Sequence, residues 1–94
     1  MITDEQILNA RILMIDDDEI SIRILTEVLY KAGFQHVTST RDPRQAVSLY
    51  QQIQPDVIAL DLYMPHLDGL DVMWQLKEIE NDEYIPIIIL STED

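Results

Sequence analysis

Three runs of four consecutive apolar residues constrain the fold of this chain more than any other feature. They lie at residues 12–15, 57–60 and 87–90. An uninterrupted apolar run of this length is typical of a strand that is buried on both faces of a parallel sheet. Segments with a helical repeat of apolar residues separate the runs. This alternation predicts an α/β fold, an open parallel sheet with right-handed crossovers and helices on both faces.

The segments between the apolar runs carry the signals of helix ends. Helices are predicted over residues 19–32, 43–53 and 70–80, a weak polar edge strand over 36–40 and a short helical turn over 5–8. Asp18 is the expected N-cap of the first helix, and Gly33 is expected just after its C-cap. Asp42 and Pro43 open the second helix. No internal linker is present, so residues 11–94 are expected to form one domain after an extension at 1–10.

Charge and composition exclude several classes of protein. Eighteen acidic residues against six basic ones give a net charge of −12, which repels nucleic acids and anionic membrane surfaces. The chain has no cysteine, which excludes disulfide bonds and thiolate metal sites. No apolar run is long enough to span a bilayer, and the N-terminal residues lack a signal-peptide pattern. We therefore expect a cytoplasmic domain that binds neither nucleic acid nor membrane.

Oxygen-bearing side chains follow each of the three apolar runs. Asp16 and Asp17 follow the first run, Asp61 follows the second and Ser91 follows the third. Open parallel sheets place their ligand sites at the carboxyl ends of the strands. Several carboxylates together favour Mg²⁺, and an aspartate can act as a nucleophile that forms an acyl phosphate. These positions predict a site that handles a phosphoryl group.

Four motifs in this order resemble the receiver domain of two-component response regulators. They are Ile15-Asp16-Asp17, Leu60-Asp61, Met64-Pro65 with Asp68-Gly69, and the segment from Pro86 to Ser91. The resemblance covers residues 11–94 and implies a flavodoxin-like sheet of strand order 2-1-3-4-5. It implies that Asp61 is the phosphoacceptor and that Asp16 and Asp17 bind Mg²⁺ together with Asp61. Tyr63 would offer its backbone carbonyl to the metal, and Ser91 would be the switch hydroxyl that contacts the phosphate.

The resemblance also implies partners and a signalling role. A sensor histidine kinase or a phosphotransfer protein would donate the phosphoryl group, and phosphorylation would change a contact with an output domain beyond this chain. Enzymatic activity would be limited to self-phosphorylation from small donors and autodephosphorylation. Receiver domains continue through a further helix, a fifth strand with an aromatic switch residue and a lysine, and a final helix. We expect this chain to lack that portion, and its only lysines, Lys31 and Lys77, fall in predicted helices.

Two other functions compete with this interpretation. One is a dimerisation or interaction module that works without phosphorylation, in which case a homodimer is the expected partner. The run at 87–90 would make an apolar sheet edge that invites pairing with another chain. The helix at 19–32 also carries more apolar residues than one side of a sheet needs. The other function is a haloacid dehalogenase-type phosphatase, which is disfavoured because Asp61-Leu62-Tyr63 follows a later strand and lacks the second acid.

Overall fold

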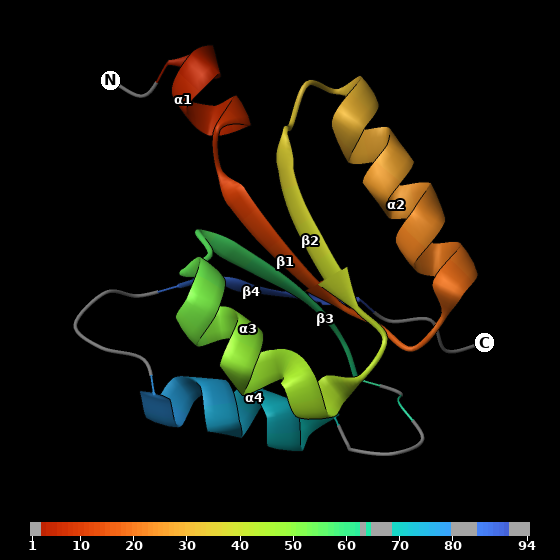
Figure 1. The fold of residues 1–94 in the computed structure, drawn as a ribbon, viewed down its shortest axis with the longest axis vertical. Helices are drawn as coiled ribbons and strands as arrows, with labels where there is room; N and C mark the ends of the chain where they lie inside the picture. The colour runs from red at the N-terminus through yellow and green to blue at the C-terminus, as the bar shows by residue number, and fades with distance from the viewer. Residues whose placement is uncertain (1–2, 63, 65–68, 80–84, 91–94) are drawn as a thin grey trace.

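The computed structural model of the protein describes residues 3–62, 64, 69–79 and 85–90. Within these residues, four parallel strands form one sheet in the order β2-β1-β3-β4 (Figure 1). The strands are β1 (Arg11–Ile15), β2 (His36–Thr40), β3 (Val57–Asp61) and β4 (Ile87–Leu90). The predicted α/β class is therefore confirmed, and so is the order of the first four strands of a flavodoxin-like sheet.

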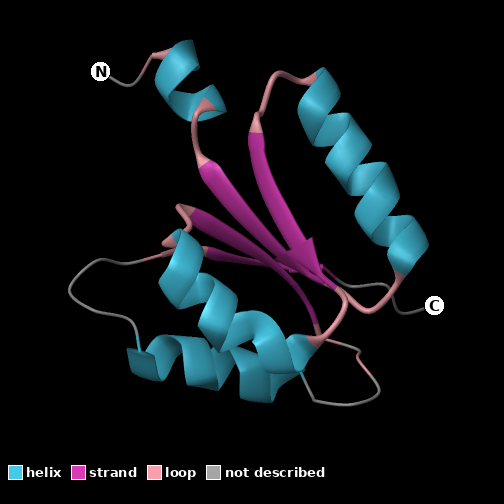
Figure 2. Cartoon of the chain, in the orientation of Figure 1, coloured by secondary structure: helices cyan, strands magenta, loops and turns pink. Residues whose placement is uncertain are grey.

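Helices lie on both faces of this sheet (Figure 2). They are α1 (Asp4–Leu8), α2 (Glu19–Lys31), α3 (Ala46–Ile53) and α4 (Gly69–Ile79), with a 3₁₀ turn, η1 (Pro43–Gln45), leading into α3. The chain places α2 on one face of the sheet and α3 with α4 on the other (Figure 1). No helix within the described ranges is long and apolar enough to cross a membrane.

Capping interactions fix the ends of the helices where the sequence predicts them. The Asp18 carboxylate accepts hydrogen bonds from the Ile20 backbone N–H at 3.1 Å and from the Ser21 hydroxyl at 2.8 Å. After α2, Gly33 adopts a φ of +107°, a left-handed conformation that side chains disfavour. Asp42 accepts a hydrogen bond from the Arg44 backbone N–H at 3.0 Å. The two caps and the conformation of Gly33 confirm the predicted start and end of α2 and the predicted start of the helical segment at Pro43.

The main hydrophobic core lies between the sheet and the pair α3 and α4. Alternate residues of β1 and β3 point to this side, as the pleat of a strand requires. The buried core residues are Leu13, Ile15, Ala46, Ile58, Leu60, Met64, Val72 and Leu76. The opposite face of the sheet is covered more thinly: Ile12, Met14 and Ala59 are buried there, but α2 contains no buried residue.

The strand β4 does not show the burial on both faces that its apolar run predicts. In the described part of the chain it lies at the edge of the sheet and pairs only with β3. Ile88 and Ile89 are 55% and 42% exposed. Only Ile87 packs against the main core. The apolar run at 87–90 predicted the strand correctly. Burial on both faces also requires packing elements on each side of β4, and the described part of the chain does not supply them.

The close approach of Gly69 to the end of β3 gives a prediction for stability. A Cβ atom at Gly69 would lie 2.4 Å from Leu62 Cα and 2.6 Å from the backbone oxygen of Asp61. Because both atoms belong to the backbone, Gly69→Ala must displace the end of β3, and we expect it to lower the free energy of unfolding by roughly 1–3 kcal/mol. Urea denaturation measures the change. Gln75→Ala, on the exposed side of α4, is the control, and equal losses in the two variants would contradict the close approach.

Candidate metal centre

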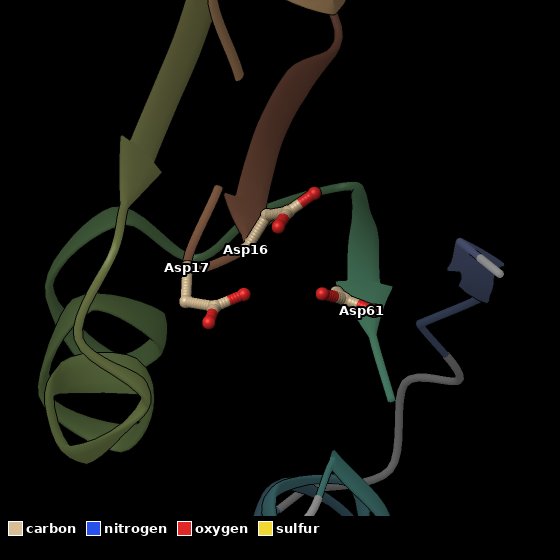
Figure 3. A group of neighbouring side chains, drawn as sticks. All are labelled: Asp16, Asp17 and Asp61. Atoms are coloured by element: carbon tan, nitrogen blue, oxygen red, sulfur yellow. The ribbon is translucent and has the colours of Figure 1, made fainter. Parts of the chain in front are cut away.

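The pairing of two neighbouring strands brings three aspartates together. Asp61 is the last residue of β3, and Asp16 follows β1 directly, with Asp17 next in the loop to α2. The parallel register pairs Ile15 with Leu60, so the residues after them lie level. One carboxylate oxygen from each aspartate lies within 4.8 Å of the others, and the side chains surround one space (Figure 3). The structure therefore places all three predicted acidic ligands in one cluster.

Burial distinguishes the three carboxylates of this cluster. Asp16 and Asp61 are each 1% exposed, whereas Asp17 is half-buried. Three carboxylates this close repel one another unless a cation offsets their charge. Mg²⁺ takes oxygen ligands and is usually held by a few carboxylates together with water and phosphate oxygens. The donor set of the cluster fits this ion.

The electrostatics of the cluster act most strongly on Asp16. The pKa of Asp16 is raised from 3.8 to about 6, and burial is the largest cause. The Asp18 backbone N–H donates to Asp16 Oδ1 at 2.9 Å and opposes this rise. The charge of Asp61, a hydrogen bond with its carboxyl group and the charge of Asp17 contribute smaller parts of the rise. A metal ion at the cluster must therefore compete with a proton on Asp16 in mildly acidic solution.

Two residues beside the cluster support its loop. Asp18 acts as a helix cap, and the hydrogen bond from the Ser21 hydroxyl is the main reason that the pKa of Asp18 is lowered. Arg41 Nε donates to the backbone oxygen of Asp17 at 3.2 Å, and the Arg41 guanidinium lies 3.9 Å from a Glu19 carboxylate oxygen. Arg41 is not among the residues predicted for the site. Its position directly after β2, the strand beside β1, was the signal that could have found it.

Two residues of the predicted site, Tyr63 and Ser91, lie outside the described residues, and their roles stay predictions. The two lysines are placed away from the cluster, as expected. Lys31 and Lys77 lie in the last turns of α2 and α4, whereas the cluster lies beside the first turn of α2.

The raised pKa of Asp16 predicts how the stability of the metal-free protein changes with pH. Between about pH 4 and about pH 6 the folded state binds more protons than the unfolded state, so stability falls as the pH rises through this range. Asp16→Asn should remove this fall and raise the free energy of unfolding at neutral pH. Urea denaturation in EDTA at several values between pH 4 and pH 7 measures the free energy of unfolding of both proteins. Glu78→Gln, on the exposed face of α4, is the control. The same pH slope in Asp16→Asn as in the parent would show that Asp16 is not the titrating group.

The sequence of the chain is similar to one family model and to several known proteins. A model of the response regulator receiver domain matches residues 12–94. Protein PilH of Pseudomonas aeruginosa is 38% identical over 85 residues, which cover 90% of this chain and 69% of that protein. Response regulator PleD of Caulobacter vibrioides is 33% identical over 87 residues, which cover 93% of this chain and 19% of PleD. A protein-glutamate methylesterase/protein-glutamine glutaminase of Archaeoglobus fulgidus is 37% identical over 87% of this chain, which spans 23% of that protein.

Solved structures share the same fold. The receiver domain of the histidine kinase CKI1 from Arabidopsis thaliana, in complex with Mg²⁺ and BeF3−, superposes with a TM-score of 0.82 at 26% identity and covers 97% of this chain and 72% of its own. The chemotaxis protein CheY4 of Vibrio cholerae gives a TM-score of 0.82 at 28% identity, over 92% of this chain and 71% of its own. With the fold, the acidic cluster and the sequence match in agreement, this chain belongs to the response regulator receiver domain family.

Proposed function

We propose that this chain is a phosphoacceptor receiver domain in which Asp61 takes a phosphoryl group from a sensor histidine kinase or a phosphotransfer protein. The acidic cluster carries the proposal, because it places a buried aspartate at a strand end beside two further carboxylates. Membership of the receiver domain family supports it. The complex of the related Arabidopsis receiver domain with Mg²⁺ and BeF3− supports it as well.

The proposed chemistry gives each residue a distinct role. A carboxylate oxygen of Asp61 forms a bond to phosphorus while the bond from phosphorus to the donor nitrogen breaks, and Asp61 becomes an acyl phosphate. Asp16, Asp17 and Asp61 would hold Mg²⁺, together with the backbone carbonyl of Tyr63. The bound ion would offset negative charge on the phosphoryl oxygens.

Charge is the reason that the proposed reaction needs a cation. Phosphorylation adds negative charge to a site that already holds three carboxylates within 4.8 Å of one another. Burial of Asp16 and Asp61 reduces the screening of this repulsion by water. The reaction is therefore strongly disfavoured when the cluster is empty, and we expect phosphorylation to depend on Mg²⁺.

Ser91 is the proposed link from the phosphoryl group to the rest of the protein. The pairing of Asp61 with Leu90 supports this role, because Ser91 follows Leu90 directly in the sequence. Its hydroxyl would hydrogen-bond a phosphoryl oxygen, a contact that only the phosphorylated protein can make. This contact would shift the equilibrium between two conformations of the domain and so change its binding to an output domain. We place this signalling in the cytoplasm, with no enzymatic activity beyond self-phosphorylation and autodephosphorylation.

An association module is the second candidate function. Ile20, Ile24 and Val28 of α2 and Ile88 of β4 each expose more than half of their surface. Exposed apolar side chains on one helix face mark an interaction surface, and the spacing of four residues puts Ile20, Ile24 and Val28 on one face of α2.

Direct phosphorylation tests the role of Asp61. Incubation of the protein with acetyl phosphate and Mg²⁺ is expected to add one phosphoryl group, read from the intact mass. Asp61→Asn keeps the shape of the side chain but removes the nucleophilic carboxylate, so we expect no gain in mass. Asp4→Asn, at an exposed position in the first turn of α1, is the matched control and should be labelled, while EDTA should prevent labelling of the parent. Labelling of Asp61→Asn would assign the phosphoryl group to another residue.

Thermal stability tests the metal site without any phosphodonor. Mg²⁺ binds the folded cluster and not the unfolded chain, so it should raise the Tm of the parent at neutral pH. Asp16→Asn and Asp17→Asn each remove one ligand and should reduce this rise, whereas Glu78→Gln should leave it unchanged. A rise of the same size in all four proteins would mean that Mg²⁺ binds elsewhere.

A further inference from the structure

The three carboxylates of the acidic cluster are not held equally by the fold. Asp61 ends β3 and Asp16 directly follows β1, and each is 1% exposed, so the packed sheet fixes both residues. Asp17 is half-buried and lies in the loop between β1 and α2. Its carboxylate points into the space that it shares with the other two (Figure 3). The position of this third ligand therefore depends on the contacts of the loop.

A side chain from the neighbouring strand holds Asp17. Arg41 directly follows β2, and its Nε donates a hydrogen bond to the backbone oxygen of Asp17 at 3.2 Å. Among the described residues, Asp17 makes no other hydrogen bond. The residues on either side have contacts of their own, since the Asp16 N–H donates to the Thr40 oxygen and the Asp18 side chain caps α2. Arg41 therefore acts on the one residue of this loop that the other contacts leave unsupported.

The backbone that carries Arg41 is well fixed. Thr40, directly before it, is 7% exposed. The Thr40 hydroxyl donates to Gln45 Oε1 at 2.8 Å and accepts a hydrogen bond from the Asp42 backbone N–H at 3.0 Å. A site residue is oriented best by a neighbour that is itself held in place. The end of β2 therefore provides a firm base from which Arg41 can orient the loop after β1.

A carboxylate directs the far end of the Arg41 side chain. One terminal nitrogen of the guanidinium lies 3.9 Å from a Glu19 carboxylate oxygen, in the first turn of α2. The two side chains are 61% and 64% exposed, and ion pairs this exposed contribute little to stability. Glu19 also offsets part of the positive charge that Arg41 brings near the cluster. Arg41 thus connects the end of β2, the loop after β1 and the start of α2.

Charge and hydrogen bonding at Arg41 predict opposite effects on a cation at the cluster. A positive charge beside the site repels a cation, so charge alone predicts that loss of Arg41 strengthens cation binding. A hydrogen bond that orients a ligand has the opposite effect, because its loss lets the ligand move and weakens metal binding. The sign of the change in affinity therefore separates the two roles.

We propose that Arg41 is a positioning residue of the metal centre, which holds the Asp17 backbone so that the Asp17 carboxylate meets the geometry that Mg²⁺ requires. This inference rests on the proposed metal site. Mg²⁺ requires nearly octahedral ligands at about 2.0–2.1 Å, whereas Ca²⁺ accepts flexible geometry at about 2.3–2.6 Å. A displaced Asp17 therefore weakens Mg²⁺ binding more than Ca²⁺ binding, although the two ions carry the same charge. Arg41 contributes to selectivity as well as to affinity.

Two variants of equal charge and similar length test the hydrogen bond. Arg41→Gln keeps an N–H donor as many bonds from the backbone as Nε, whereas Arg41→Met places a methyl group there. We expect the Kd for Mg²⁺, measured by calorimetry at neutral pH, to be about fivefold higher in Arg41→Met than in Arg41→Gln. The Kd for Ca²⁺ should differ less. Both variants should fold, because the Arg41 side chain is 61% exposed, and circular dichroism checks this.

Backbone dynamics test the same contact without any metal. In EDTA, the ¹⁵N order parameter of the Asp17 amide should fall in Arg41→Met and keep its parental value in Arg41→Gln. Equal Mg²⁺ affinities in the two variants, or Mg²⁺ and Ca²⁺ affinities that differ by the same factor, would overturn the role of Arg41 and leave the metal site in place. A folded parent that binds no Mg²⁺ would overturn the metal site itself, and this inference with it.

Discussion

The parallel pairing of β1 with β3 is the interaction on which the rest of the structure depends. It sets Ile15 level with Leu60, and so brings Asp16 beside Asp61. A slip of one residue would turn every side chain of the strand to the opposite face of the sheet and separate the carboxylates. The same pairing aligns the apolar residues that fill the main core. Burial of apolar side chains therefore stabilises the register that holds mutually repelling charges together.

The two faces of the sheet are packed unequally, and this difference separates two tasks. On one face, α3 and α4 enclose the main core, and Gly69 brings α4 against the backbone at the end of β3. This face fixes the position of Asp61. On the other face, α2 buries no residue completely, and Ile20, Ile24 and Val28 are exposed. Asp16 lies on this second face, beside residues of α2. The packed face thus fixes the backbone of β1 and β3, and the acidic cluster opens toward the face that is thinly covered.

Local signals in the sequence predicted most of the fold, whereas features that depend on tertiary neighbours were missed or incomplete. The apolar run at 57–60 and the cap at Asp18 are read from a few adjacent residues, and both predictions are confirmed. The exposure of Ile88 was not predictable, because an apolar run does not reveal which strands flank it. The contact of Arg41 with the loop after β1 also depends on residues far apart in the sequence. The clustering of Asp16 with Asp61 was predictable only because parallel strands end at the same edge of a sheet.

Asp16 is the residue at which burial and charge oppose each other most clearly. Its side chain is 1% exposed, and its pKa is raised from 3.8 to about 6, with burial as the largest cause. The Asp18 backbone N–H donates to Asp16 Oδ1 at 2.9 Å and offsets part of the cost of the buried charge. The neighbouring carboxylates of Asp61 and Asp17 add to that cost, so a positive charge at the cluster would stabilise all three side chains together. The fold thus holds the three aspartates in a position that favours binding of a cation over an empty cluster.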